Sequence, residues 1–186
     1  MDKIRLKIYP NGRGMPPLIK QQVVDFLRIQ WPEGFIGQNR LRAWITRKNQ
    51  HPTNFVLSEN GLVISHLEVV WKYLRHAGKN YKTYGLTGVL TYPSFRKQGY
   101  GVRLLKEAKK YIEKSDADIV MFNSNLKGFY EKAGFERLEN VVTLVGDPKK
   151  PEKTVQCAFM LFLSDKGKRG KTNFENIPVY FGEETW

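Results

Sequence analysis

The pattern of hydrophobic and polar residues along the chain predicts a protein in which strands and helices are interspersed. Residues 4–8 alternate between apolar and polar side chains, as in a half-buried strand. Residues 19–27 carry apolar side chains at helical spacing, which predicts a helix that ends before Pro32. A shorter helical pattern covers residues 41–45. Further strands are predicted at residues 55–57, 62–74, 81–92, 119–122 and 155–163, and another begins at Phe135.

The most regular helical pattern lies in the middle of the chain, directly after a glycine-containing loop. Its apolar residues fall on one face of a helix: Leu104, Leu105, Ala108, Tyr111 and Ile112. Gly99 and Gly101 flank the start of this helix, and Pro93 ends the strand before it. Glycines allow close approach of the backbone, so the unpaired amides of the first helical turn can point at one external group. The loop therefore predicts a site for an anion, most plausibly a phosphate, with a plain connecting loop as the alternative.

Charge is the unusual feature of the composition. The chain has 31 Lys and Arg residues against 18 Asp and Glu residues, a formal net charge of +13. Such an excess attracts polyanions, which include nucleic acids, acidic carrier proteins and phosphorylated cofactors. The lysines are spread over nearly every loop and are not interleaved with an aromatic stacking series. We therefore do not expect a nucleic-acid-binding role, despite the charge.

Length and composition indicate one globular domain. A chain of 186 residues with 41% hydrophobic residues can bury a sizeable core. No apolar run approaches the length of a membrane span, and the start of the chain lacks the apolar region of a signal peptide. Cys157 is the only cysteine, which excludes an internal disulfide and a cysteine-based metal cluster. We expect a cytoplasmic protein with no membrane partner and no metal.

Two motifs in the middle third of the chain resemble a known family. Arg96-Lys97-Gln98-Gly99-Tyr100-Gly101 resembles the acyl-CoA pyrophosphate loop of the GNAT superfamily of N-acetyltransferases, which has the pattern Arg/Gln-x-x-Gly-x-Gly/Ala. Residues 123–135 resemble the superfamily's second segment, an asparagine followed by a short helix and Tyr-x-x-x-Gly-Phe. The two motifs occur in the family's order and are separated by a predicted helix and strand.

The resemblance implies an α/β (α+β) fold with a mixed central sheet of about seven strands. In the GNAT fold the parallel fourth and fifth strands splay apart, and about four helices flank the sheet. The pantetheine arm of the cofactor pairs with the backbone that the splay exposes. We expect residues 1–186 to form a single domain, with residues 164–186 as a tail that folds back toward the acceptor site. The first part of this tail, Ser164–Lys171, is polar and is expected to cross open surface with little packing.

The resemblance also implies roles for individual residues. The residues that would bind the cofactor are Leu90, Thr91, Arg96, Lys97, Gln98, Gly99, Tyr100, Gly101, Asn123 and Tyr130. Main-chain groups of Leu90 and Thr91 would hold the pantetheine arm, and Asn123 would hydrogen-bond the pantetheine or the region of the sulfur. Tyr130 would donate a proton to the departing thiolate; a purely structural packing role is the alternative.

The general base is not given by the resemblance. Superfamily members often carry a glutamate on the strand that ends at Pro93, but that strand has no acidic residue, and Thr87 occupies the position where an acid would be expected. His66 and Glu68 share one face of the preceding strand and could act as base directly or through water. A structural role for His66 is the alternative.

The flanking segments resemble the aminoglycoside 2′-N-acetyltransferases. This resemblance lies in residues 63–70 and in the C-terminal segment Gly182-Glu183-Glu184-Thr185-Trp186. In those enzymes an acidic-x-Trp terminus folds back so that the last carboxylate reaches the acceptor. The resemblance therefore implies that Glu183, Glu184 and the Trp186 carboxylate meet the acceptor amine, and it places Trp186 among the catalytic candidates with Tyr130, His66 and Glu68. A tail that only covers an apolar patch is the alternative.

Together these features predict an acyl-CoA-dependent N-acyltransferase with acetyl-CoA as cosubstrate. Transfer to a primary amine would proceed by direct attack in a ternary complex, so no nucleophilic residue is needed. The expected partner is a small-molecule amine acceptor of the aminoglycoside type, and the sequence leaves the oligomeric state open. Three alternatives remain: an acyltransferase that uses an acidic acyl-carrier protein, a non-catalytic CoA-binding regulator and a nucleic-acid-binding protein.

Overall fold

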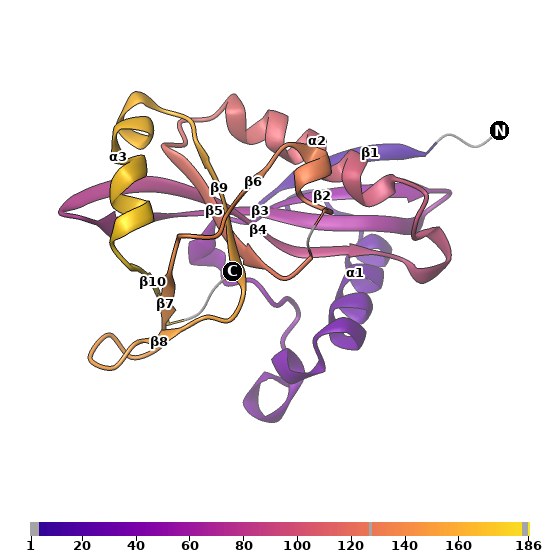
Figure 1. Cartoon of the computed structure of the whole chain (residues 1–186). Helices are drawn as coiled ribbons and strands as arrows, with labels where there is room; N and C mark the ends of the chain where they lie inside the picture. The colour runs from indigo at the N-terminus through magenta and orange to yellow at the C-terminus, as the bar shows by residue number, and fades with distance from the viewer. Residues whose placement is uncertain (1–3, 127, 184–185) are drawn as a thin grey trace. The chain divides into compact units, whose positions relative to one another are not determined.

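The computed structural model describes residues 4–126, 128–183 and 186 (Figure 1). These residues fold into two compact units. The first comprises Met1–Val70 with Thr87–Leu104, and the second comprises Trp71–Leu86 with Leu105–Trp186. The chain passes from one unit to the other within the strands β3 and β4 and within the helix α2.

The strands and helices follow the order that the sequence predicts for much of the chain. The α-helices are α1 (Pro17–Gln30), α2 (Tyr100–Glu113) and α3 (Asp165–Asn176). The strands are β1 (Arg5–Pro10), β2 (Thr53–Glu59), β3 (Leu62–His76), β4 (Lys79–Thr91), β5 (Ile119–Ser124), β6 (Glu136–Leu138), β7 (Thr143–Val145), β8 (Glu152–Lys153), β9 (Cys157–Phe162) and β10 (Val179–Gly182). Short 3-10 turns cover Pro32–Phe35, Gly37–Asn39, Lys48–Gln50, Pro93–Phe95 and Glu131–Ala133.

In the first unit, helix α1 packs on an antiparallel set of strands. Strand β2 pairs with β1 on one side and with β3 on the other. The apolar face of α1 consists of Ile19, Val23 and Leu27, and Val23 and Leu27 are fully buried. This face packs with apolar side chains from each of these strands in one cluster. The helix begins at a proline, and Pro32 follows its end, as the sequence predicts.

In the second unit, strand β5 lies between a parallel and an antiparallel neighbour. It pairs in parallel with β4 through Thr83↔Ile119 and Tyr84↔Val120, and antiparallel with β9 along its whole length. Its first four residues are buried, which explains the continuous apolar run in the sequence. A second, three-stranded sheet has the order β10-β7-β8.

The strand topology confirms the fold predicted from the sequence. Seven strands follow one another in the hydrogen-bonded order β1-β2-β3-β4-β5-β9-β6, and β4 and β5 are the parallel pair. Pairing between these two ends at Tyr84↔Val120, although both strands continue beyond this point.

Two predicted helices are absent from the described residues, which contain three α-helices rather than about four. The pattern at residues 41–45 does not form a helix; the segment is irregular between the turns Gly37–Asn39 and Lys48–Gln50. Its Trp44 side chain instead bonds to a buried carboxylate described below. The expected helix after Asn123 is reduced to the 3-10 turn Glu131–Ala133, which Gly134 ends with a φ of +85°.

The expectation that Ser164–Lys171 crosses open surface with little packing is wrong, because this polar segment forms most of α3. Ser164 caps the helix by accepting a hydrogen bond from the Gly167 amide at 3.0 Å. Gly167, Gly170 and Phe174 make the buried face. A side chain at Gly167 would overlap the Asp118 carbonyl, and one at Gly170 would overlap the Tyr81 side chain. Glycines therefore stand on the buried face at positions where apolar residues would give the usual helical pattern.

Candidate active site

The predicted anion loop lies between β4 and α2, within the first unit. The backbone turns through Lys97 with a φ of +62° and Gly99 with a φ of +84°. Helix α2 begins at Tyr100, and the Arg103 amide donates to the Gly99 carbonyl at 2.9 Å. The earlier amides of the helix have no acceptor within it. A Cβ at Gly99 would have no atom within 4 Å apart from its neighbours along the chain, so the loop is open at Gly99. The loop fits an external anion.

Two side chains of the loop stabilise it by hydrogen bonds to its own backbone. The Arg96 Nε donates to the Thr91 carbonyl at 3.0 Å, and the Gln98 Nε2 donates to the Ser94 carbonyl at 3.0 Å. Arg96, Lys97 and Gln98 are exposed. Two cationic side chains therefore stand beside the open amides, which favours an anion further.

The predicted main-chain contacts at the end of β4 already have protein partners. The Ser65 hydroxyl donates to the Leu90 carbonyl at 2.7 Å and lies 2.9 Å from the Thr91 hydroxyl. Sequence reasoning missed Ser65. The signal was a small polar residue inside a strand that is buried without interruption from Val63 to Val70.

The two base candidates on β3 lie in one buried polar network within the first unit. Glu68 is fully buried, and its carboxylate accepts hydrogen bonds from the Trp44 indole at 2.6 Å and from the Thr46 hydroxyl. The Asn54 side chain also bonds to it. Burial raises the pKa of Glu68 to about 7, although the hydrogen bonds from Thr46, Trp44 and Asn54 lower it in part. Trp44 and Thr46 were not predicted, because the segment between the 3-10 turns carries no pattern that points to Glu68.

His66 is the second member of this network and is also fully buried. Its Nδ1 lies 3.0 Å from the Gly88 carbonyl oxygen, and its Nε2 lies 2.9 Å from the Asn54 Oδ1. Burial lowers the pKa of His66 to about 4, against a smaller opposing effect of the Gly88 hydrogen bond. The Gly88 carbonyl and the Asn54 Oδ1 are both acceptors, so neutral His66, which has one ring hydrogen, donates to only one of them. The Asn54 side-chain nitrogen is the donor to Glu68, since this hydrogen bond lowers the pKa of the carboxyl group.

The second motif lies in the second unit, where Asn123 leaves one polar atom without a partner. The Asn123 Nδ2 donates to the Thr143 hydroxyl at 3.1 Å and to the Gln156 carbonyl at 3.4 Å. Its Oδ1 is buried and has no hydrogen-bond partner among the described residues. A buried acceptor of this kind can take an N–H donor from a bound molecule. This observation supports the predicted contact between Asn123 and the amide-bearing arm of a cofactor.

Tyr130 is buried in an aromatic cluster. Its ring packs against Phe122 and Phe159, with centroid distances of 4.8 Å and 5.0 Å. Burial raises the pKa of the Tyr130 phenol above its ordinary value, while a hydrogen bond with Ser124 lowers it in part. The hydroxyl therefore keeps its proton at neutral pH, as a proton donor must.

The C-terminal candidates divide into a described and an undescribed part. Glu184 lies outside the described residues, and Glu183 is exposed. Trp186 is half-buried in the second unit, where its indole Nε1 donates to the Met121 carbonyl at 2.7 Å.

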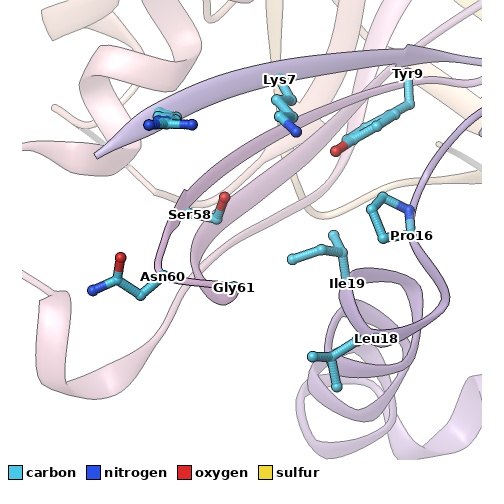
Figure 2. Close-up of a pocket in the computed structure, with 9 residues that line it drawn as sticks. Lys7, Tyr9, Pro16, Leu18, Ile19, Ser58, Asn60 and Gly61 are labelled. Carbon is cyan, nitrogen blue, oxygen red and sulfur yellow. The ribbon is translucent and has the colours of Figure 1, made fainter. Parts of the chain in front are cut away.

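Two surface hollows lie apart from most of the predicted residues. One, of about 350 Å³, lies in the first unit between β1, the β2–β3 turn and the start of α1. Lys7 and Tyr9 project into it from β1, opposite Ile19 (Figure 2). The other, of about 570 Å³, lies in the second unit and is lined partly by Thr143 and Gln156, the two partners of Asn123.

Comparison with known proteins shows the family. Residues 21–135, more than half of the chain, match the acetyltransferase (GNAT) family. The chain therefore belongs to this family, which confirms the resemblance carried by the two motifs. No curated protein matches the chain.

Solved structures share the fold at low sequence identity. An Escherichia coli GNAT family N-acetyltransferase in complex with CoA is 14% identical, with a TM-score of 0.58, over 98% of this chain and 89% of that one. An aminoglycoside 6′-N-acetyltransferase complexed with coenzyme A is 14% identical, with a TM-score of 0.59, over 86% of this chain and 97% of that one. The chain spans only 32% of an Enterococcus faecalis protein described as a probable N-acyltransferase, at 15% identity over 72% of this chain and a TM-score of 0.56. The aminoglycoside enzyme here is a 6′-acetyltransferase, so the likeness to 2′ enzymes stays a prediction.

Neither a membrane-spanning helix nor a metal-binding cluster is found among the described residues. None of their helices has both the length and the apolar character needed to cross a membrane. No group of three or more histidine, cysteine, aspartate or glutamate side chains among them is arranged to hold a metal ion.

Proposed function

We propose that this protein transfers an acetyl group from acetyl-CoA to a primary amine, by direct attack of the amine. The observation that carries the proposal is the start of α2 directly after the exposed Gly99, with Arg96 and Lys97 exposed in the same loop, in a chain of the GNAT family. These amides and cations would bind the pyrophosphate of the cofactor. When bound, acetyl-CoA supplies the activated acetyl thioester.

Asn123 and Tyr130, in the second unit, are our further candidates for contacts with the cofactor. The unpartnered Asn123 Oδ1 would accept a hydrogen bond from an amide of the pantetheine arm. Tyr130 would hold a proton on its phenol oxygen and release it to the leaving thiolate. Main-chain groups at Leu90 and Thr91 would orient the arm, since a carbonyl oxygen bonded by Ser65 or Arg96 keeps a second lone pair.

Glu68 is our candidate for the general base, acting through Thr46. The Thr46 hydroxyl is half-buried and bonds to Glu68, so it connects the buried carboxylate with the surface. Thr46 could accept the proton of an amine and pass its own to Glu68. A pKa of about 7 suits a base that works near neutral pH. His66 would keep Asn54 and Glu68 oriented, as a positioning residue.

The acceptor side of the proposal rests on the end of the chain. Glu183, Glu184 and the Trp186 carboxylate would bind the ammonium form of the acceptor and so concentrate it near the site. A polyamine of the aminoglycoside type fits three carboxylates, and the aminoglycoside 6′-N-acetyltransferase shares the fold. The net charge of +13 opposes long-range attraction of such a polycation, so this binding would depend on the local acidic cluster.

Thermal stabilisation and thiol release test the proposal. Acetyl-CoA and CoA should each raise the melting temperature, whereas a DNA oligonucleotide should not. CoA should then be released from acetyl-CoA only when an amine is added, with aminoglycosides, polyamines and a lysine peptide as the acceptor panel. Stabilisation without release for any amine would support a non-catalytic CoA-binding protein. Release only from an acetylated carrier protein would support the carrier-dependent alternative, and stabilisation by DNA alone would refute the proposal.

A further inference from the structure

The side chain of Trp186 lies where the pairing between β4 and β5 ends. The last paired residues are Tyr84 and Val120, so Gly85 and Met121 are the next positions in the same register. The indole donates to the Met121 carbonyl at 2.7 Å. It also lies directly against Gly85, where any Cβ would overlap the indole ring. The C-terminal side chain therefore contacts both strands immediately beyond their last pair.

The indole is held firmly in this place by other parts of the second unit. Its ring meets that of Phe181 on β10 edge to face, with centroids 5.1 Å apart. The Lys72 ammonium lies 4.6 Å from the Trp186 ring centroid and 3.8 Å from that of Phe181. Lys72 also donates to the Phe181 carbonyl. The indole thus contacts residues of four strands, β3, β4, β5 and β10. These contacts give the end of the chain a defined position, whereas chain ends that are not held by such contacts are poorly ordered.

Glycine at position 85 is explained by this contact. Gly85 lies within a strand, where glycine weakens the structure, and it does not have the positive φ that favours glycine in turns. The absence of a side chain lets the indole approach the backbone of β4. The chain thus gives up strand stability at this position to admit the indole.

We propose that the Trp186 indole, placed against Gly85 and Met121 within the second unit, forms the end of the acyl-binding site and limits the transferred acyl group to a short one, such as acetyl. The inference rests on the proposed function and deepens it. If the pyrophosphate binds at the loop after β4 and the arm follows β4 back from Thr91, the acyl group is the part nearest to Gly85. An acyl group longer than acetyl would then have to displace the indole.

The expected selectivity for short acyl groups follows from the apolar character of the indole that ends the acyl-binding site. The indole ring of Trp186 offers an apolar surface, and it is anchored by a hydrogen bond to the Met121 carbonyl and by Lys72. In such pockets one methylene typically changes discrimination by about 10- to 200-fold. We therefore expect butyryl-CoA to bind at least about tenfold more weakly than acetyl-CoA, and hexanoyl-CoA more weakly still.

The test uses variants that keep the terminal carboxylate. Dissociation constants for CoA, acetyl-CoA, butyryl-CoA and hexanoyl-CoA are measured by thermal shift and calorimetry on the full-length protein and on Trp186→Leu. The leucine variant should bind butyryl-CoA at least as tightly as acetyl-CoA. Trp186→Phe keeps an aromatic ring against Phe181 and Lys72, and should show a smaller change in the same direction if the leucine variant does not fold. Val145→Ala trims a residue of β7 that packs on the same core, and should keep the preference for acetyl-CoA.

The outcomes separate this inference from the function on which it rests. Equal binding of acetyl-CoA and hexanoyl-CoA by the unaltered protein would overturn the inference and leave the function standing. So would an unchanged preference in both Trp186 variants. If no CoA compound binds, the proposed function is refuted and the inference is overturned with it.

Discussion

The buried pair Glu68 and His66 gives the sharpest test of the structure, because each should hide the pH dependence of the other. Relative to the unaltered protein, replacement of Glu68 by Gln should make the free energy of unfolding rise with pH between about 4.5 and 7. Replacement of His66 by Gln should make it fall with pH between about 4 and 6.5. The unaltered protein should show neither slope between about 4.5 and 6.5.

The signs follow from the direction of each pKa change. Burial raises the pKa of Glu68 from 4.5 to about 7, so its contribution to stability is complete below pH 4.5 and is lost as the pH rises to about 7. Burial lowers the pKa of His66 from 6.5 to about 4, so its contribution is complete above pH 6.5 and is lost as the pH falls to about 4. Between these limits the two slopes are opposite and cancel.

The magnitude follows from the same values. Each pKa moves by 2.5 pH units, from 4.5 to 7 for Glu68 and from 6.5 to 4 for His66. At about 1.4 kcal/mol for each pH unit, each group changes the free energy of unfolding by about 3 kcal/mol over its range. This is a large part of the stability of a typical domain.

The measurement is urea unfolding at several pH values from 4.5 to 7.5 for the unaltered protein and both variants. Differences from the unaltered protein remove the contribution of all other titrating groups. Glu33→Gln removes an exposed carboxylate and should give a curve parallel to that of the unaltered protein. If the Glu68→Gln curve is also parallel, Glu68 is ionised in the folded protein and the protonation assigned to the network is wrong.

Three further predictions concern the proposed site. Gly99→Val should abolish the thermal stabilisation by CoA, because the new side chain would stand before the first amides of α2. Gly12→Val, at another glycine with open surroundings and a positive φ of +67°, should keep this stabilisation. Equal changes of melting temperature on addition of CoA in both variants would contradict the assignment of the loop as the anion site. Tyr130→Phe should lower kcat by roughly 10²- to 10⁴-fold with little change in the affinity for CoA. The control Tyr180→Phe loses a hydroxyl bonded to the Gly146 carbonyl and should leave kcat unchanged. An equal loss of kcat and of CoA affinity in Tyr130→Phe would mean that Tyr130 has a structural role. Deletion of residues 183–186 should preserve binding of CoA and raise KM for the amine, measured by thiol release.

Local signals in the sequence were sufficient for the parts of the fold that depend on neighbouring residues. The helix α1 follows from the spacing of Ile19, Val23 and Leu27 and from the proline after it. The loop at Gly99 follows from glycines between a strand and an amphipathic helix, and in the structure the helix begins directly after Gly99, at Tyr100. Such features are set within a few residues, so a single sequence is enough to find them.

Features set by distant contacts could not be predicted. Helix α3 was missed because Gly167 and Gly170 occupy the face where apolar residues would signal a helix, and their reason is close packing on Asp118 and Tyr81. Segment 41–45 has helical spacing, but Trp44 and Thr46 bond instead to Glu68, more than twenty residues away. Glu68 and His66 could be named as candidates from the face of β3, whereas their burial and shared partner Asn54 required the fold.

The end of the chain carries two proposed roles that one deletion cannot separate, so the deletion of residues 183–186 must be compared with Trp186→Leu. Both variants lose the indole contacts with Met121 and Phe181, and both should lose a comparable amount of stability, on the order of 2–4 kcal/mol. Only the deletion removes the acidic side chain of Glu183 and relocates the terminal carboxylate. Because a hydrogen bond to a charged group contributes about 1.5–3 kcal/mol, the deletion should raise KM for the amine about 10- to 100-fold above that of Trp186→Leu. A glycine appended after Trp186 keeps the indole and displaces the carboxylate, and it should raise KM while preserving the preference for acetyl-CoA. Equal KM values in all three variants would show that the carboxylates do not bind the acceptor and that the tail serves the protein through its indole alone.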